Sequence, residues 1–297
     1  SRSAFRRGSR RRSEARPLLS KTLLDLHVHD RGSVCFPREV KAGPLVTETQ
    51  ANLNLSAWRR LATDLGLSGV LTDQSARELV GRLFRCALAI LHSPQYQEDH
   101  QDTLAQDWAH LPIPSDPVVF DRLVEAGDKV ATLLDPSTDA DHVMRDLLGA
   151  DRVKHLGVIR RRSGGPVDAT DLAVTVTYYG AAKGDWKPRA FSDEEQAPFE
   201  WGDNTGDLYI NGEVYFAIVP VAVWRFELGG YPTLKKWLGY RQANRRGGHL
   251  LTLAEAHHLR SMIQRLAALL TLHQQLNQLY GAASALSLTA EDLGLRA

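Results

Sequence analysis

Basic and aromatic residues gather most densely in residues 223–241, which read VWRFELGGYPTLKKWLGYR. Lysine and arginine bind phosphate groups, while arginine, glutamine and asparagine side chains hydrogen-bond to base edges. No acidic residue occurs in residues 233–241 to neutralise the cations. The residue types therefore predict a surface that binds nucleic acid, with lysines on phosphates and the later polar residues on bases. Its candidate residues are Lys235, Lys236, Tyr240, Arg241, Gln242, Asn244, Arg245 and Arg246.

Two further basic segments lie in the same half of the chain, and glycine beside each of them predicts a loop. Their candidate residues are Arg160, Arg161, Arg162, Lys183, Lys187 and Arg189. A basic loop taken alone is more often a solvated surface than a binding site. Three such segments in one sheet-rich half favour double-stranded DNA as the partner, because phosphate contacts supply affinity while a few side chains read bases.

A different chemistry is suggested by His27 and His29 in the segment DLHVHD. On a strand, these two side chains would project to one face and could bind one metal ion. The segment resembles the first-strand motif of amidohydrolases and related metal-dependent phosphoesterases, whose barrels need further ligands at the ends of later strands. Because residues 75–148 predict helices almost without strands, two histidines on an exposed strand are the simpler interpretation. A metal-dependent hydrolase stays open as an alternative function, and a protein-interaction module is a second one.

Motifs of known catalytic sites are missing from the chain. It contains no phosphate-binding loop, no dinucleotide-binding G-x-G-x-x-G, no G-x-S-x-G and no Asn/Asp-Pro-Pro-Tyr/Phe of the amino-methyltransferases. We therefore expect no catalytic residue, metal or cofactor in this chain itself. The only two cysteines, Cys35 and Cys86, are too few for a disulfide framework, which favours a reducing cytoplasm. No apolar run is long enough to predict a membrane span.

Hydrophobic periodicity predicts an α+β protein, in which a helical layer is followed by a mostly antiparallel sheet with a long C-terminal helix packed on it. The Asn211-Gly212 pair is the strongest hairpin signal, and Thr252 with Glu255 forms a capping box at the start of the last helix. The predicted helices are residues 75–92, 95–108, 120–133, 233–241 and 252–281. The predicted strands include residues 172–179, 207–210 and 223–228.

The charge distribution suggests where the chain divides. The net charge is only +1, but the first 21 residues are strongly basic. This segment contains Arg2, Arg6, Arg7, Arg10, Arg11, Arg12, Arg16 and Lys21 against Glu14. We expect residues 1–49 to be a basic arm and the tail of an upstream domain, since the chain lacks an initiator methionine. Residues 50–297 would form one functional domain, with a helical part at 50–150 and the sheet and C-terminal helices at 151–297.

The order of several segments resembles the C-terminal specificity domain of type ISP restriction-modification enzymes, over roughly residues 50–280. These segments are LHSPQY at 91–96, LAQDWAHLPIP at 104–114, Asn211-Gly212, residues 223–241 and the helix that Thr252 begins. The resemblance implies recognition of an asymmetric DNA site and presentation of the target adenine to an upstream methyltransferase. S-adenosylmethionine, ATP and magnesium would bind only to upstream methyltransferase, helicase and nuclease domains. The chain would then be part of an adenine-N6 DNA methyltransferase and restriction endonuclease.

A helical wheel divides residues 233–241 into two faces. Leu234, Trp237 and Leu238 fall on one face, which predicts that Trp237 belongs to the core. Lys235, Lys236 and Tyr240 fall on the other face and remain candidates for DNA contact. Arg241 ends the helix on the apolar side, where it can extend to solvent, pair with an acid or reach DNA.

Overall fold

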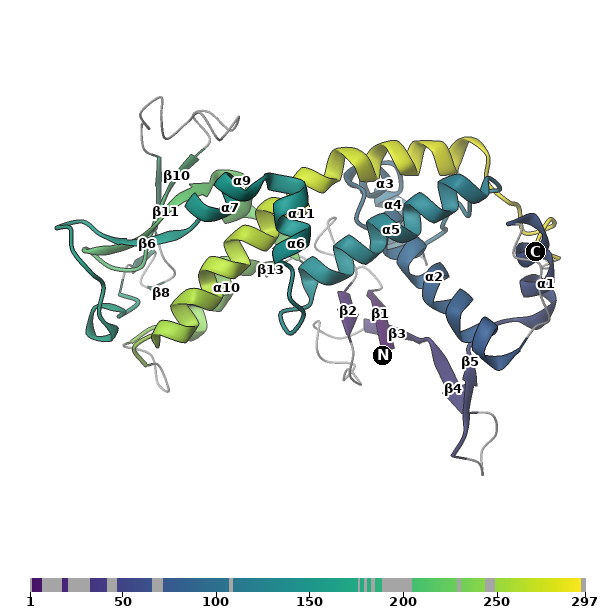
Figure 1. The fold of residues 1–297 in the computed structure, drawn as a ribbon, viewed down its shortest axis with the longest axis horizontal. Coiled ribbons are helices and arrows are strands. Elements are labelled where there is room, and N and C mark those ends of the chain that lie inside the picture. The colour runs from purple at the N-terminus through teal and green to yellow at the C-terminus, as the bar shows by residue number, and fades with distance from the viewer. Residues whose placement is uncertain are drawn as a thin grey trace. The chain divides into compact units, whose positions relative to one another are not determined.

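In the computed structural model, the chain forms two compact units (Figure 1). Unit 1 comprises Ser1–Thr138 and Leu272–Ala297, and unit 2 comprises Asp139–Thr271. The structure describes residues 2–6, 18–20, 33–41, 47–65, 72–106, 109–175, 177–178, 181–182, 185–188, 205–228, 231–243 and 249–294.

Unit 1 is mainly helical. Its helices are α1 Leu55–Asp64, α2 Asp73–Leu91, α3 Pro94–Asp99, α4 Gln101–Gln106, α5 Pro117–Leu134 and the second half of α11 Leu253–Ala285. Its strands are β1 Arg2–Arg6, β2 Leu18–Ser20 and β3 Ser33–Pro37 in one sheet, and β4 Glu39–Lys41 paired with β5 Thr49–Ala51. The helix predicted at residues 75–92 is confirmed as α2, which Thr72 caps by accepting a hydrogen bond from the Ser75 backbone N–H at 3.1 Å.

The single helix predicted at residues 95–108 is wrong, because α3 ends before His100 and α4 begins after it. The break coincides with tertiary contacts from α11. The Tyr280 hydroxyl donates to Asp99 Oδ2 at 2.9 Å and lies 3.3 Å from His100 Nε2. Periodicity within residues 95–108 contains no information about these contacts, which explains the error.

Helices α2 and α5 pack closely because a glycine lies at their contact. A Cβ added to Gly127 would overlap the backbone carbonyl of Arg85. Arg85 Nε also pairs with Asp128 Oδ1 at 2.7 Å, beside this contact. The buried side chains of α5 include Phe120, Leu123 and Val130, all at 0% exposure, so the apolar face predicted from the sequence is confirmed.

Unit 2 is built around a four-stranded antiparallel sheet of order β6-β11-β10-β9. Its strands are β6 Val158–Arg161, β9 Asp185–Pro188, β10 Thr205–Tyr209 and β11 Val214–Pro220. The short elements are β7 Thr177–Tyr178, β8 Ala181–Ala182, β12 Glu227–Leu228, β13 Tyr231–Pro232 and the 3-10 helix η1 Ala169–Asp171. The helices are α6 Asp141–Leu148, α7 Ala150–His155, α9 Val221–Arg225, α10 Thr233–Tyr240 and the first half of α11.

The predicted hairpin at Asn211-Gly212 joins β10 to β11 and is confirmed. Asn211 Oδ1 accepts from the backbone N–H groups of Glu213 and Val214 at 2.9 and 2.7 Å. The Asn211 amide donates to the carbonyl oxygens of Asp171 and Ala173 at 2.7 and 2.9 Å. One side chain therefore closes the turn and ties it to the segment before β7.

Two predicted strands are corrected. In residues 172–175 and 177–178, the described part of the predicted strand 172–179, the extended elements are the two-residue strand β7 and an isolated bridge between Val174 and Gln242. Residues 223–228 begin inside helix α9, and only β12 is extended. Val223 and Phe226 are buried three positions apart, which is helical spacing and does not fit the period of two of a strand with one buried face. Gly229 and Gly230, predicted to turn the chain, lie outside the described residues.

The long C-terminal helix and the α+β class are confirmed. Thr252 and Glu255 form the predicted capping box, and α11 continues past the predicted end at Gly281 to Ala285. Within unit 2, α11 packs beside the start of β6, where a Cβ added to Gly157 would lie 3.3 Å from the Ile263 side chain. Among the described residues, no helix combines the length and the apolarity needed to cross a membrane.

Candidate nucleic-acid interface

Helix α10 places two lysines over aromatic rings. Lys235 Nζ lies 4.9 Å from the ring centre of Trp224 in α9, and Lys236 Nζ lies 4.8 Å from that of Tyr231 in β13. Lys236 also lies 5.9 Å from the ring of Tyr240, which is 59% exposed. A cation over an aromatic face is stabilised by about 0.5–1 kcal/mol at an exposed site. These contacts hold the ammonium groups in place and leave their N–H donors available to phosphate oxygens.

Arg241, at the end of α10, pairs with an acid. Its Nε donates to Glu255 Oε1 at 2.9 Å, and its guanidinium lies 3.9 Å from the ring centre of Trp237. The prediction that Trp237 belongs to the core is wrong, because its ring is only partly buried under Arg241, whereas Leu234 and Leu238 are at 0% exposure. Of the three roles open to Arg241 in the sequence, the structure selects the ion pair.

Glu255 is the centre of a small charge cluster. Burial by itself would raise the pKa of Glu255, but hydrogen bonds from the Thr252 backbone and from Arg241 and His249 outweigh it and lower the pKa to about 2. His249 Nε2 lies 3.0 Å from Glu255 Oε2. The carboxylate therefore joins the end of α10, the segment at residue 249 and the start of α11.

Of the other predicted DNA-binding residues, Gln242 is buried and five lie outside the described residues. Gln242 is 8% exposed, and the backbone N–H of Ala243 donates to the Val174 carbonyl at 3.3 Å. This position takes the Gln242 side chain out of the surface predicted to read bases. Asn244, Arg245, Arg246, Lys183 and Arg189 lie outside the described residues.

The arginine run at residues 160–162 begins in a strand, so the prediction of a loop is wrong for its first two residues. Arg161 pairs with Asp171 on the side of the sheet that faces the core. Arg160 is exposed on the opposite face, and the predicted loop starts only at Arg162. The left-handed φ angles of 80° and 85° that follow, at Gly164 and Gly165, are the conformations that glycine adopts most easily.

Lys187 lies in β9 and extends over the ring of Tyr209 in β10, with Nζ 4.9 Å from the ring centre. Tyr209 in turn stacks on Tyr215 in β11, with ring centres 5.0 Å apart and planes inclined by 27°. Sequence reasoning missed both tyrosines. The hairpin signal at Asn211 was sufficient to place them on facing strands, but the apolar residues around Tyr215 gave no indication of which face of the sheet it occupies.

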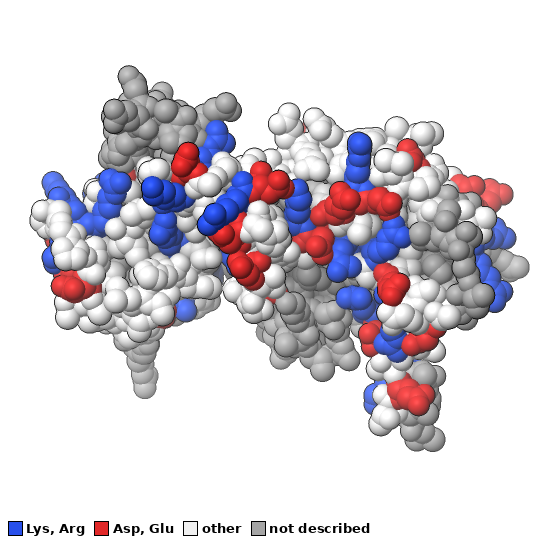
Figure 2. Space-filling view, in the orientation of Figure 1, with Lys and Arg blue, Asp and Glu red and all other residues white. Residues whose placement is uncertain are grey.

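Ion pairs occur within both units. In unit 1, Arg77 pairs with Glu39 at 2.7 Å, and Arg82 pairs with Asp121. In unit 2, the pairs are Arg145 with Asp141, Arg161 with Asp171 and Arg241 with Glu255. In Figure 2, blue and red atoms both appear over the visible faces of unit 1 and of unit 2.

The sequence profile of the Type ISP C-terminal specificity domain matches residues 5–266. The chain belongs to this family. The resemblance predicted from the sequence is thereby confirmed, and the matched region also includes most of the N-terminal arm that the resemblance left unassigned. A comparison with curated protein sequences finds no match.

Two solved structures share the fold of this specificity domain. One is described as the ATP-dependent Type ISP restriction-modification enzyme LlaBIII bound to DNA, with a TM-score of 0.51 and 12% identity over 97% of this chain. The other is a DrdV–DNA complex, with a TM-score of 0.52 and 20% identity over 94% of this chain. The specificity domain spans 16% and 24% of those two chains, respectively.

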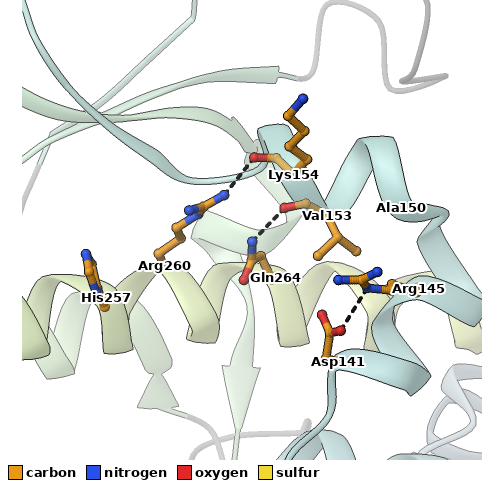
Figure 3. Close-up of a pocket in the computed structure, with 8 residues that line it drawn as sticks. All are labelled: Asp141, Arg145, Ala150, Val153, Lys154, His257, Arg260 and Gln264. Carbon is orange, nitrogen blue, oxygen red and sulfur yellow. Dashed lines mark hydrogen bonds and ion pairs between the residues drawn. The ribbon is translucent and has the colours of Figure 1, made fainter.

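One hollow of the specificity domain, of about 460 Å³, lies within unit 2 between α6, α7 and α11 (Figure 3). Several of its polar side chains bind groups of the protein itself. Arg260 donates to the Lys154 carbonyl at 2.6 Å, Gln264 donates to the Val153 carbonyl at 2.6 Å, and Arg145 pairs with Asp141 at 2.8 Å. Arg260 and Gln264 thus satisfy carbonyl groups at the end of α7 and connect α7 to α11.

The described part of the specificity domain contains no cluster of three or more side chains suited to holding a metal ion. His27 and His29, on which the alternative of a metal-dependent hydrolase rests, lie outside the described residues. The family match favours target recognition over that alternative and over a general protein-interaction module.

Proposed function

We propose that this chain recognises a specific sequence in double-stranded DNA and positions the target adenine for a methyltransferase domain upstream in the same polypeptide. The observation that carries the proposal is the family match over residues 5–266. Both structural relatives are described in complex with DNA, which is consistent with it. The methyltransferase, with its S-adenosylmethionine, and the ATP- and magnesium-dependent nuclease and helicase activities belong to upstream domains in this proposal, and the whole enzyme acts in the cytoplasm.

The contacts divide into phosphate binding and base reading. Lys235 and Lys236 are exposed or half-buried and lie over rings, a placement that suits phosphate contacts in a fixed register. We assign base reading to Asn244 and Arg245, because Arg241 and Gln242 already have structural positions. Further phosphate contacts are proposed for Tyr240, Arg160, Arg161, Arg162, Lys183, Lys187, Arg189 and Arg246; for Arg161 this requires release from Asp171.

Adenine N6 lies inside the stacked duplex, so a methyltransferase reaches it only after the base leaves the stack. Extrusion costs a few kcal/mol and deforms the duplex. The role of the specificity domain in this step is to hold the flanking DNA by its phosphates and base edges while the base is displaced.

The proposal is tested by the salt dependence of DNA binding. We expect the chain to bind duplex DNA with a log–log slope against salt that is steeply negative, since each phosphate contact contributes about −0.9. The double variant Lys235→Gln with Lys236→Gln should reduce the magnitude of the slope by up to about 1.8. Fluorescence anisotropy with a labelled duplex between about 50 and 200 mM salt measures both quantities.

A matched control is Arg59→Gln with Arg122→Gln, which removes two exposed charges from unit 1. This control should leave the slope nearly unchanged. A slope near zero for the unaltered chain would exclude DNA binding through phosphates. Equal losses in the two double variants would show that net charge, rather than the α10 surface, governs binding.

A further inference from the structure

The outer face of the unit 2 sheet carries a row of two cations and two tyrosines. Across the strands, Tyr209 lies opposite Tyr215, and Tyr215 lies opposite Arg160. Lys187 lies opposite Asp207, two residues before Tyr209, and therefore projects from the same face. We call Lys187, Tyr209, Tyr215 and Arg160 the tyrosine row. Its order across the sheet is cation, ring, ring, cation.

The two faces of this sheet have different compositions. The inner face has Leu208 opposite Phe216, both at 0% exposure. On the outer face, Tyr209 and Tyr215 are partly exposed, while Lys187 and Arg160 are exposed. Tyr209 and Tyr215 are thus more accessible than Leu208 and Phe216, and also more accessible than Asp207 and Ala217, which are buried on their own face.

The backbone beneath the row is irregular and constrained. The pairing of β10 with β11 shifts between Gly206 and Leu208, and Ile218 opposite this shift has a φ angle of 57°. A β-branched residue in this left-handed region costs roughly 1–2 kcal/mol. The buried Asp207 carboxylate offsets part of this cost, because its Oδ1 accepts from the Ile218 backbone N–H at 3.2 Å. Bulges redirect side chains, and this one adjoins Tyr209.

Gly206 fixes the neighbouring strand. A Cβ at this position would overlap the Lys187 carbonyl and would lie 2.7 Å from the Trp186 ring, whose Nε1 donates to the Val219 carbonyl at 2.8 Å. Strands β9, β10 and β11 are thus held in one register. The tyrosine pair consequently stands on a rigid support rather than on a loop.

We propose that the tyrosine row is a stacking site for a nucleobase that is outside the duplex stack. Aromatic rings on a rigid sheet, flanked by cations that bind the backbone, match the chemistry by which proteins bind unstacked nucleotides. The Tyr209 ring is partly exposed, and the exposed Lys187 side chain extends over it. A base replaces the ammonium over the ring, and Lys187 moves to the adjoining phosphate. The inference rests on the proposed function, in which one base leaves the duplex.

The test compares two DNA probes on the full chain: a short single-stranded oligonucleotide containing 2-aminopurine, and a fully paired duplex. The double variant Tyr209→Leu with Tyr215→Leu should bind the single strand about 5- to 150-fold more weakly for each stacked base lost. Its affinity for the duplex should change less than about twofold. Tyr209→Phe with Tyr215→Phe should bind both probes like the unaltered chain, because phenylalanine keeps the stacking ring.

Thermal unfolding reports whether the leucine variant is folded, and Lys187→Gln supplies a second measurement that leaves the rings intact. This variant should lower the magnitude of the salt slope for the single strand by about 0.7. With the unaltered chain, 2-aminopurine fluorescence should be quenched on binding. Equal losses for both probes, unchanged binding in the leucine and Lys187→Gln variants, or unquenched fluorescence would overturn the proposal.

The two proposals fail in distinguishable ways. If the duplex does not bind but the single strand binds through the tyrosines, duplex recognition is wrong and the stacking site stands. If the duplex binds through Lys235 and Lys236 but the affinity for the single strand is the same in the leucine variant, only the stacking site is wrong.

Discussion

At the scale of single residues, Glu255 connects the end of α10 to the start of α11. Its carboxylate accepts from the Thr252 backbone, from Arg241 and from His249, and it caps the start of α11. Arg241 in turn covers the Trp237 ring. A residue that the sequence indicates only as a helix cap therefore also holds the arginine at the end of α10.

Replacing Glu255 by glutamine should change how stability depends on pH. The folded-state pKa of about 2 lies below the ordinary 4.5, so the carboxylate stabilises the fold above about pH 4.5. This stabilisation is lost as the pH falls from about 4.5 through about 2. Urea unfolding of the unaltered chain should thus show a fall in stability over this interval that is smaller in Glu255→Gln.

The matched control for this pH effect is Glu125→Gln, at an exposed position of α5. Its pH profile should follow that of the unaltered chain. Parallel profiles for Glu255→Gln and the unaltered chain would show that Glu255 does not carry the effect.

At the scale of elements, glycine positions distinguish tight contacts from open ones. Gly127 in α5 lies against the Arg85 backbone of α2, whereas Gly281 in α11 has open space where a Cβ would be. Both are helical glycines, and helix propensity alone predicts that alanine would stabilise either position. The contact at Gly127 reverses this expectation.

Gly127→Ala should lower the free energy of unfolding by about 1–3 kcal/mol, because α2 and α5 must separate to admit a methyl group. Gly281→Ala should raise it by about 0.5–1 kcal/mol. Chemical denaturation of the two variants measures this difference in sign. Similar effects of the two substitutions would contradict the close packing of α2 against α5.

At the scale of the whole molecule, α11 contributes residues to both compact units, which meet in the sequence between Thr271 and Leu272. Thr271 is exposed, and its hydroxyl donates to the Ala267 carbonyl at 3.1 Å. The helix continues without a break through this position. Its continuity therefore contributes to the stability of both units.

Thr271→Pro should destabilise the chain by about 3 kcal/mol or more, because proline removes a helical hydrogen bond and clashes with the preceding turn. Thr271→Ala, which keeps the helix, should change stability by less than about 1 kcal/mol. Calorimetry should show a lower unfolding midpoint only for the proline variant. A midpoint unchanged by proline would mean that α11 does not need to be continuous.

The sequence by itself determined the helices with strong periodicity, the Asn211 hairpin and the Thr252 capping box, because these signals are local and depend on neighbouring residues. It also determined the family, through the order of segments along the chain. Only the tertiary structure decided that α3 and α4 are separate, that Arg241 pairs with Glu255, and that Tyr209 and Tyr215 share the outer face of the sheet. These three features depend on contacts with residues that are distant in the sequence or lie on a neighbouring strand. Such contacts are set by packing, which no local pattern encodes.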